Sequence, residues 1–215
     1  MTPPQDLLLD VQRRLEKFYE LEPCERVTDF IIGEDQAAQL PGGGSRTLVE
    51  QDANGISLAV FLEGSVSVRL LESDPRERLD GANLNALCTL TEEVSHFVYL
   101  LFCARVSRTV TELELELQGE LDKYLTVTVL QSLQNSGCFS PRLRQRLFRH
   151  YRLVAGLTPE REERYRTASQ LADRYCDWLE RRYLNGGRFR ELAREMRRFY
   201  RLGQREKLER IAALQ

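Results

Sequence analysis

The side chains with the clearest potential for chemistry lie between residues 93 and 120. Glu93 and His96 are three positions apart, and Glu116 and Glu120 are four positions apart further along the chain. Residues three or four apart share one face of an α-helix. Carboxylates and an imidazole on facing helices can ligate a metal ion or exchange protons with a bound ligand. These four residues are therefore the candidate catalytic or ligand-binding residues.

Two helices, predicted over residues 82–106 and 109–134, must position this cluster. Helices joined by a short loop usually pack antiparallel. If the turn is centred near residue 108, positions equidistant from it lie level, because both helices rise by the same amount per residue. This predicts that His96 meets Glu120 and that Glu93 meets Lys123. A purely structural contact between two helices would place these residues in the same way.

The spacing Glu93-x-x-His96 resembles half of the ligand pattern of di-iron carboxylate proteins. The full pattern needs two such motifs, but the chain's other histidine, His150, has Leu147 three positions before it. The sequence also lacks the H-E-x-x-H and paired C-x-x-C spacings of zinc sites. We therefore expect no metal and no cofactor. A structural contact, an acid–base or ligand pocket and a metal site stay open as interpretations of the cluster.

Charge is divided unevenly along the chain. The 215 residues carry a formal net charge of −2, but residues 1–140 hold 11 basic and 23 acidic side chains, whereas residues 141–215 hold 20 and 10. Such asymmetry suggests that the basic end meets something acidic. The acidic partner can be another protein, a nucleic acid, or the acidic part of the same chain.

Residues 188–212 are predicted to form one amphipathic helix in this basic end. One of its faces is apolar, and another carries the predicted partner-binding residues Arg190, Arg194, Arg197 and Arg201. The glycine-containing break at residues 185–187 predicts that this helix is separable from the rest. We expect a protein partner or self-association through these arginines. Nucleic acid is less favoured, because the sequence pI of about 5.9 is below that of dedicated nucleic-acid-binding domains.

The predicted fold class is α+β and predominantly α-helical, a helical bundle with a small antiparallel β-hairpin near the N-terminus. The hairpin is predicted over residues 46–63 around an Asn54-Gly55 turn, which pairs Val49 with Val60. A strand is predicted over residues 27–32. Helical patterns are predicted at residues 5–20, 64–72, 82–106, 109–134, 141–155, 158–184 and 188–212.

Two regions follow from these elements. Residues 1–155 form an α+β body with the β-hairpin (46–63) and a central helical hairpin (82–134), and residues 156–215 form a basic helical C-terminal region packed on that body.

Function and location follow from what the sequence contains and lacks. The N-terminus has no export signal, and the five cysteines lack a C-x-x-C spacing, which favours free thiols in a reducing cytoplasm. The longest apolar run, residues 97–104, is too short for a membrane span, which needs about 20 residues. We expect a cytoplasmic, non-catalytic binding or assembly protein that acts through its basic C-terminal helices. The first alternative is an enzyme or a ligand- or metal-binding protein that uses the Glu/His cluster, and the second is nucleic-acid binding.

Overall fold

The computed structural model describes residues 4–52, 55–138, 140, 142–149 and 158–214. Helices dominate this part of the chain, and a two-stranded antiparallel sheet lies near its N-terminus, which confirms the predicted fold class. The helices are α1 (Gln5–Tyr19), α2 (Glu34–Ala37), α3 (Gly64–Glu72), α4 (Leu84–Arg105), α5 (Glu112–Gln134), α6 (Leu143–Arg149), α7 (Pro159–Arg182), α8 (Phe189–Arg201) and α9 (Gln204–Ala212). Two 3-10 turns, η1 (Val27–Phe30) and η2 (Leu184–Gly186), and two strands, β1 (Arg46–Asp52) and β2 (Gly55–Phe61), complete it.

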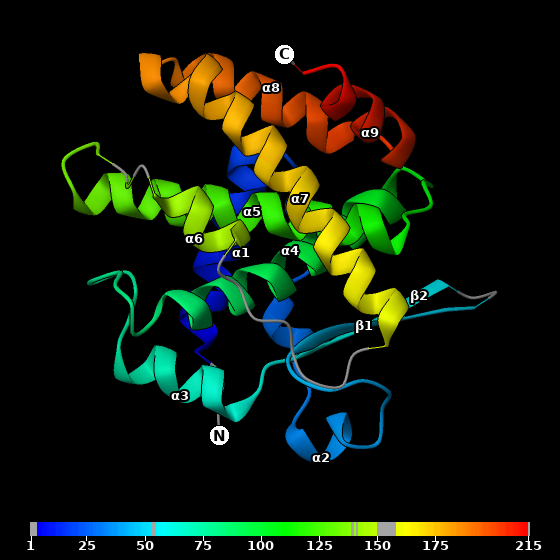
Figure 1. The fold of residues 1–215 in the computed structure, drawn as a ribbon. Helices are drawn as coiled ribbons and strands as arrows, with labels where there is room; N and C mark the ends of the chain where they lie inside the picture. The colour runs from blue at the N-terminus through cyan, green and yellow to red at the C-terminus, as the bar shows by residue number, and fades with distance from the viewer. Residues whose placement is uncertain (1–3, 53–54, 139, 141, 150–157, 215) are drawn as a thin grey trace.

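The central helical hairpin of α4 and α5 forms the middle of the molecule (Figure 1). Leu90, Val94 and Phe97 of α4 are fully buried, and Leu117 and Leu121 of α5 are nearly so. Helices α1 and α3 and the β-hairpin pack on α4, while α6 and α7 pack on α5. By length and composition α4 qualifies as a candidate membrane span, and 72% of its most apolar window is buried inside this fold.

The β-hairpin forms where it was predicted but in a different register. Val49 pairs with Leu58 instead of Val60, a shift of two positions. Asn54 of the predicted turn lies outside the described residues. Because side chains alternate between the two faces of a strand, a shift of two leaves each on its predicted face. Val60 therefore stays fully buried, in a strand that packs on α4.

The predicted strand at residues 27–32 is wrong. Its first four residues form η1, and of the rest only Ile31 makes a β-bridge, to Val60. The side-chain oxygen of Gln12 in α1 accepts a hydrogen bond of 2.9 Å from the Val27 amide. That contact holds the segment against α1, so tertiary packing overrides the β-propensity of its residues.

The predicted single helix at residues 188–212 is also wrong, because it divides into α8 and α9. Leu202 has an extended backbone, and Gly203 begins α9 with its amide donating to the Glu206 carboxylate at 3.0 Å. The break turns α9 back toward the core, where Lys207 and Ile211 are buried.

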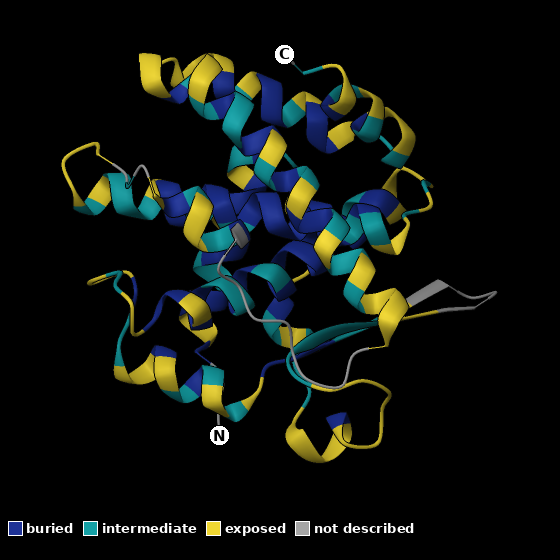
Figure 2. Cartoon of the chain, viewed as in Figure 1, coloured by how far each residue is buried: buried dark blue, intermediate teal, exposed yellow. Residues whose placement is uncertain are grey.

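Helices α8 and α9 lie at one end of the molecule, and α7 runs from that end across α5 toward the β-hairpin (Figure 1). The buried faces of these three helices join the central core (Figure 2). The ring of Tyr200 in α8 stacks on Tyr19 of α1 with centroids 4.0 Å apart and meets Tyr99 of α4 edge-on at 4.8 Å. Phe199 stacks on Tyr175 of α7 at 4.2 Å. The expected boundary at residues 155/156 falls within residues 150–157, outside the described part of the chain.

Candidate functional site

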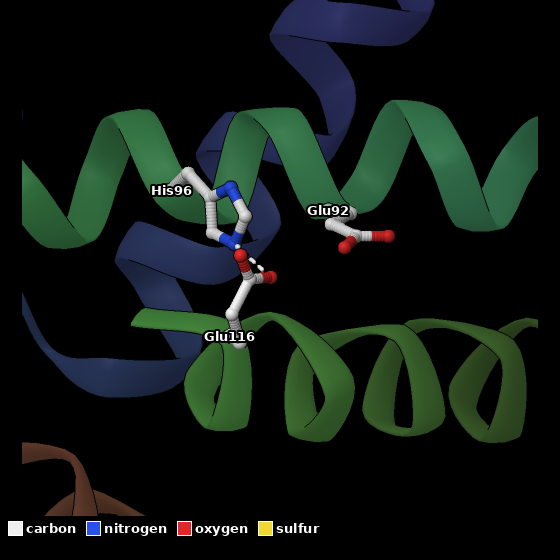
Figure 3. A group of neighbouring side chains, drawn as sticks. All are labelled: Glu92, His96 and Glu116. Carbon is white, nitrogen blue, oxygen red and sulfur yellow. Dashed lines mark ion pairs between the residues drawn. The ribbon is translucent and has the colours of Figure 1, made fainter. Parts of the chain in front are cut away.

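His96 and two glutamates form a compact group between α4 and α5. The Nε2 atom of His96 lies 3.6 Å from a carboxylate oxygen of Glu116 on the facing helix. Glu92, one turn before His96 on α4, presents its carboxylate to the same space (Figure 3). One ligand atom from each of these three residues lies within 4.8 Å of the others.

Gly119 allows the histidine ring to approach α5 this closely. A Cβ atom at Gly119 would lie 2.9 Å from the Nε2 atom of His96 and 3.5 Å from the Cγ atom of Glu92. Real Cβ atoms essentially never approach other atoms within 3.0 Å. The absence of a side chain at Gly119, one helical turn after Glu116, therefore allows the His96 ring to occupy its position against α5.

The ion pairs differ from those that the sequence predicts. The Lys123 ammonium lies 2.9 Å from Glu92 and 3.0 Å from Glu120, instead of pairing with Glu93. The Glu93 carboxylate accepts a hydrogen bond of 2.8 Å from the Thr47 hydroxyl in β1 and lies 4.0 Å from the Nδ1 atom of His96.

The four candidate residues predicted from the sequence, Glu93, His96, Glu116 and Glu120, are all buried in this region. The sequence analysis did not identify Glu92. A separation of four positions from His96 is as compatible with a shared helix face as the three of Glu93, so the sequence did carry this signal.

Burial controls the ionisation of this cluster. It lowers the pKa of His96 to about 4, which keeps the imidazole neutral near pH 7. Burial also raises the pKa of Glu116 to about 8 and the pKa of Glu93 well above its ordinary value. The Lys123 ammonium outweighs the effect of burial at Glu92, whose pKa is lowered. A neutral imidazole is the form that metal ions bind, whereas the Glu116 carboxyl group must lose its proton to bind one.

Two buried atoms of the group have no hydrogen-bond partner among the described residues. They are the Nε2 atom of His96 and the Oε2 atom of Glu116, which face each other. Each residue is only 7% exposed. Arg164 of α7 lies at the edge of the group, with its Nε atom 3.9 Å from Glu116 and another nitrogen bonded to Glu112. Buried polar atoms left without a partner cost stability, so this pair is a favourable place for a bound ion or water.

A second buried polar cluster was not predicted at all. Lys207 of α9 is fully buried and donates hydrogen bonds to the Tyr99 hydroxyl at 2.7 Å and to Gln118 at 3.0 Å. The Tyr99 hydroxyl in turn donates to Glu114, and Gln118 donates to Asp122 at 3.1 Å. Its atoms have hydrogen-bond partners within the protein, which favours a structural role.

The predicted partner-binding arginines divide into two pairs. Arg190 and Arg194 are exposed at the start of α8. Arg197 donates to the Phe18 carbonyl at 2.6 Å and pairs with Glu20, and Arg201 donates to the Tyr19 carbonyl at 2.9 Å. The second pair therefore caps the carbonyl groups at the C-terminal end of α1, which lack partners within their own helix.

Comparison with known proteins adds no relative to this description. No family model matches the chain, and neither a curated protein nor a solved structure is detectably similar to it.

Proposed function

We propose that the protein binds one divalent metal ion between α4 and α5, with Glu92, His96 and Glu116 as its ligands. The observation that carries this proposal is the unpartnered Nε2 atom of His96, which is buried and faces an equally unpartnered oxygen of Glu116. This departs from the expectation that the chain holds no metal, which rested on an incomplete ligand set. Glu92 supplies the missing ligand.

The spacing of the donor atoms suits a first-row transition metal. Zinc bonds to imidazole nitrogen and carboxylate oxygen at about 2.0–2.2 Å, so two ligands of a tetrahedral site lie about 3.4 Å apart. The 3.6 Å between the His96 and Glu116 donor atoms is close to this value. Glu92 is half-buried, with 21% of its side chain exposed, and one of its carboxylate oxygens lies within 4.8 Å of the His96 and Glu116 donor atoms.

The formal charges around the site also favour a divalent cation. Four carboxylates surround it, from Glu92, Glu93, Glu116 and Glu120, against the two cations Lys123 and Arg164. Burial of this excess of negative charge raises the pKa of Glu116 to about 8 and the pKa of Glu93 well above its ordinary value, so protons offset the charge near pH 7. A divalent cation would take the place of those protons, so metal binding should release them.

Three protein ligands leave at least one coordination position open. Structural zinc sites usually have four protein ligands, whereas catalytic sites keep a position for water or substrate. The proposed site is of the second kind, and a bound metal ion there would act on water or on a small ligand.

Metal titration of the purified chain tests this proposal. Protein stripped with a chelator is titrated by calorimetry with Zn²⁺, Mn²⁺ and Co²⁺, and we expect about one ion per chain for at least one of them. His96→Ala should weaken that binding more than about 100-fold, since losing a first ligand costs more than losing a supporting group, which already costs 10–100-fold.

Glu93→Gln is the matched control. Glu93 is buried like His96 on the same helix, but its carboxylate already accepts a hydrogen bond from Thr47. It should weaken binding by less than about tenfold. If none of the three ions binds to the intact chain, or if His96→Ala binds as well as the intact chain does, the proposal fails.

Assembly through the C-terminal helices is the second candidate function. It is supported by exposed Arg190 and Arg194 beside Phe189, which is 54% exposed at the start of α8. Sedimentation of the intact chain should then show self-association that weakens with salt and is lost in Arg190→Glu/Arg194→Glu. Arg205→Glu, an exposed arginine on α9, is the control. A monomer under all conditions would exclude self-association.

Nucleic-acid binding gains less support from the fold. Tyr175, Phe199 and Tyr200 are core residues, so they offer no faces on which bases can stack. Phosphate contacts by the exposed arginines and stacking on the exposed ring of Phe189 are left for that function.

A further inference from the structure

An apolar groove of about 540 Å³ lies between α1, α4 and α5. Leu7, Val11 and Leu15 of α1 form one side, Leu87 of α4 lies among them, and each of these four residues is at most 2% exposed. The other side comes from α5, where Leu125, Val129 and Leu130 line the groove. Its volume is within the range of about 300–1,000 Å³ that small-molecule sites occupy.

Charged side chains surround this apolar lining, and most are basic. They are Arg14, Lys17, Arg76 and Arg197, together with the single acid Asp10. Three of these cations already have a carboxylate partner. Arg14 pairs with Asp10, Arg76 with Asp74 and Arg197 with Glu20.

Lys17 carries the one positive charge that is left. It is exposed and forms no ion pair with any residue that the structure describes. It lies in the last turn of α1, about 15 Å along the helix from Leu7 at a rise of 1.5 Å per residue. The groove thus combines an apolar channel with one uncompensated cation at one end.

We propose that this groove binds a long-chain fatty acid, a single alkyl chain with one carboxylate. The chain lies against the partly exposed side chains of Phe18, Val129 and Leu130, and the carboxylate meets the Lys17 ammonium. An amphipathic molecule with one negative charge matches both the apolar lining and the single unpaired cation, whereas a neutral chain leaves Lys17 unused. This site is independent of the proposed metal site.

Displacement of a fluorescent fatty acid tests the proposal on the full chain. The probe is cis-parinarate, and the competitors are hexadecanoate and hexadecan-1-ol, which have the same chain length but differ in charge. We expect hexadecanoate to displace the probe at micromolar concentration and the alcohol to be at least about tenfold weaker. If neither displaces the probe, or the probe does not bind, the groove has another occupant and the proposal fails. Equal potency of the two competitors would refute the role of Lys17.

Paired variants locate the binding site. Val129 is 38% exposed and lines the groove, while Leu133 is 67% exposed one turn later on α5 and does not. Val129→Asp should weaken hexadecanoate binding at least tenfold, and Leu133→Asp should leave it unchanged. Equal effects of the two substitutions would place the fatty acid elsewhere.

A second pair keeps the test valid if Val129→Asp does not fold. Lys17→Gln should abolish the preference for hexadecanoate over the alcohol, whereas Arg13→Gln, also exposed on α1 but outside the groove, should retain it. Both positions are exposed, so neither change disturbs the core. An unchanged preference in Lys17→Gln would overturn the assignment of the carboxylate.

Discussion

The Lys207 ammonium in α9 donates a hydrogen bond of 2.7 Å to the hydroxyl of Tyr99 in α4. The two residues are 108 positions apart in the chain, and Lys207 is fully buried. The bond therefore fixes the last helix of the chain to the central helix. A lysine at this depth is costly unless its partners are in place, so the contact also specifies how α9 must dock.

The buried lysine makes stability depend on pH. Burial lowers the pKa of Lys207 in the folded protein to about 7, against 10.5 as the ordinary value. Between these values the unfolded chain binds a proton that the folded chain does not, so the free energy of unfolding rises with pH. The charged groups that face Lys207 are Glu114, Arg108 and Asp122.

Lys207→Met should remove that contribution. From pH 7 to pH 9 the difference in unfolding free energy between the intact protein and the variant should change by up to about 1.4 kcal/mol per pH unit. Urea denaturation at several pH values measures it. Lys17→Met, at an exposed lysine, should leave the slope of the intact protein unchanged. Parallel curves for the intact protein and Lys207→Met would contradict the assignment.

Gly119→Ala should destabilise the protein by about 1–3 kcal/mol, because its Cβ atom would lie 2.9 Å from His96. Thermal denaturation measures the loss. The double variant Gly119→Ala/His96→Ala should be less destabilised than the sum of the two single changes, since the clash needs the imidazole. Additive effects would show that His96 does not rest against Gly119.

The arginines of α8 should differ in their effect on stability. Arg197→Ala and Arg201→Ala should each cost about 1–2 kcal/mol, because each leaves carbonyl groups at the end of α1 without a donor. Arg190→Ala and Arg194→Ala on the same helix should stay within about 0.5 kcal/mol of the intact protein. Urea denaturation of the four variants tests this difference. Equal costs would mean that the contacts with α1 contribute nothing.

Removal of residues 187–215 should prevent folding. The break at residues 185–187 favours separability in the sequence, but this segment supplies the buried apolar side chains Leu192, Met196, Phe199, Tyr200 and Ile211. At about 1.5–3 kcal/mol each, their loss costs roughly 7–15 kcal/mol, as much as the whole stability of a typical domain. Circular dichroism of the truncated chain is the measurement. A cooperative unfolding transition in that fragment would show that the C-terminal helices are dispensable.

Local patterns in the sequence were sufficient to place most of the helices. Helix α3 begins and ends where its pattern predicts, and α7 begins at Pro159 after Thr158, whose hydroxyl accepts from the Arg161 amide. Capping and periodicity depend on residues within a few positions of each other, so one stretch of chain contains all the information. The apolar face of the β-hairpin was predicted for the same reason, because apolar and polar side chains alternate along a short stretch of strand.

Contacts between distant residues decided the rest. The sequence predicted that Glu93, His96, Glu116 and Glu120 lie close together. Their positions along the axes of the two helices did not determine which carboxylate faces the imidazole. The partner of the imidazole depends on Gly119, which leaves room for the His96 ring, and on Lys123, which forms ion pairs with Glu92 and Glu120. Likewise, the break between α8 and α9 at Gly203 is explained only by the tertiary structure, in which Lys207 of α9 donates a hydrogen bond to Tyr99 of α4. Rotation of a helix about its axis is set by what packs against it, and this is settled only when the whole chain has folded.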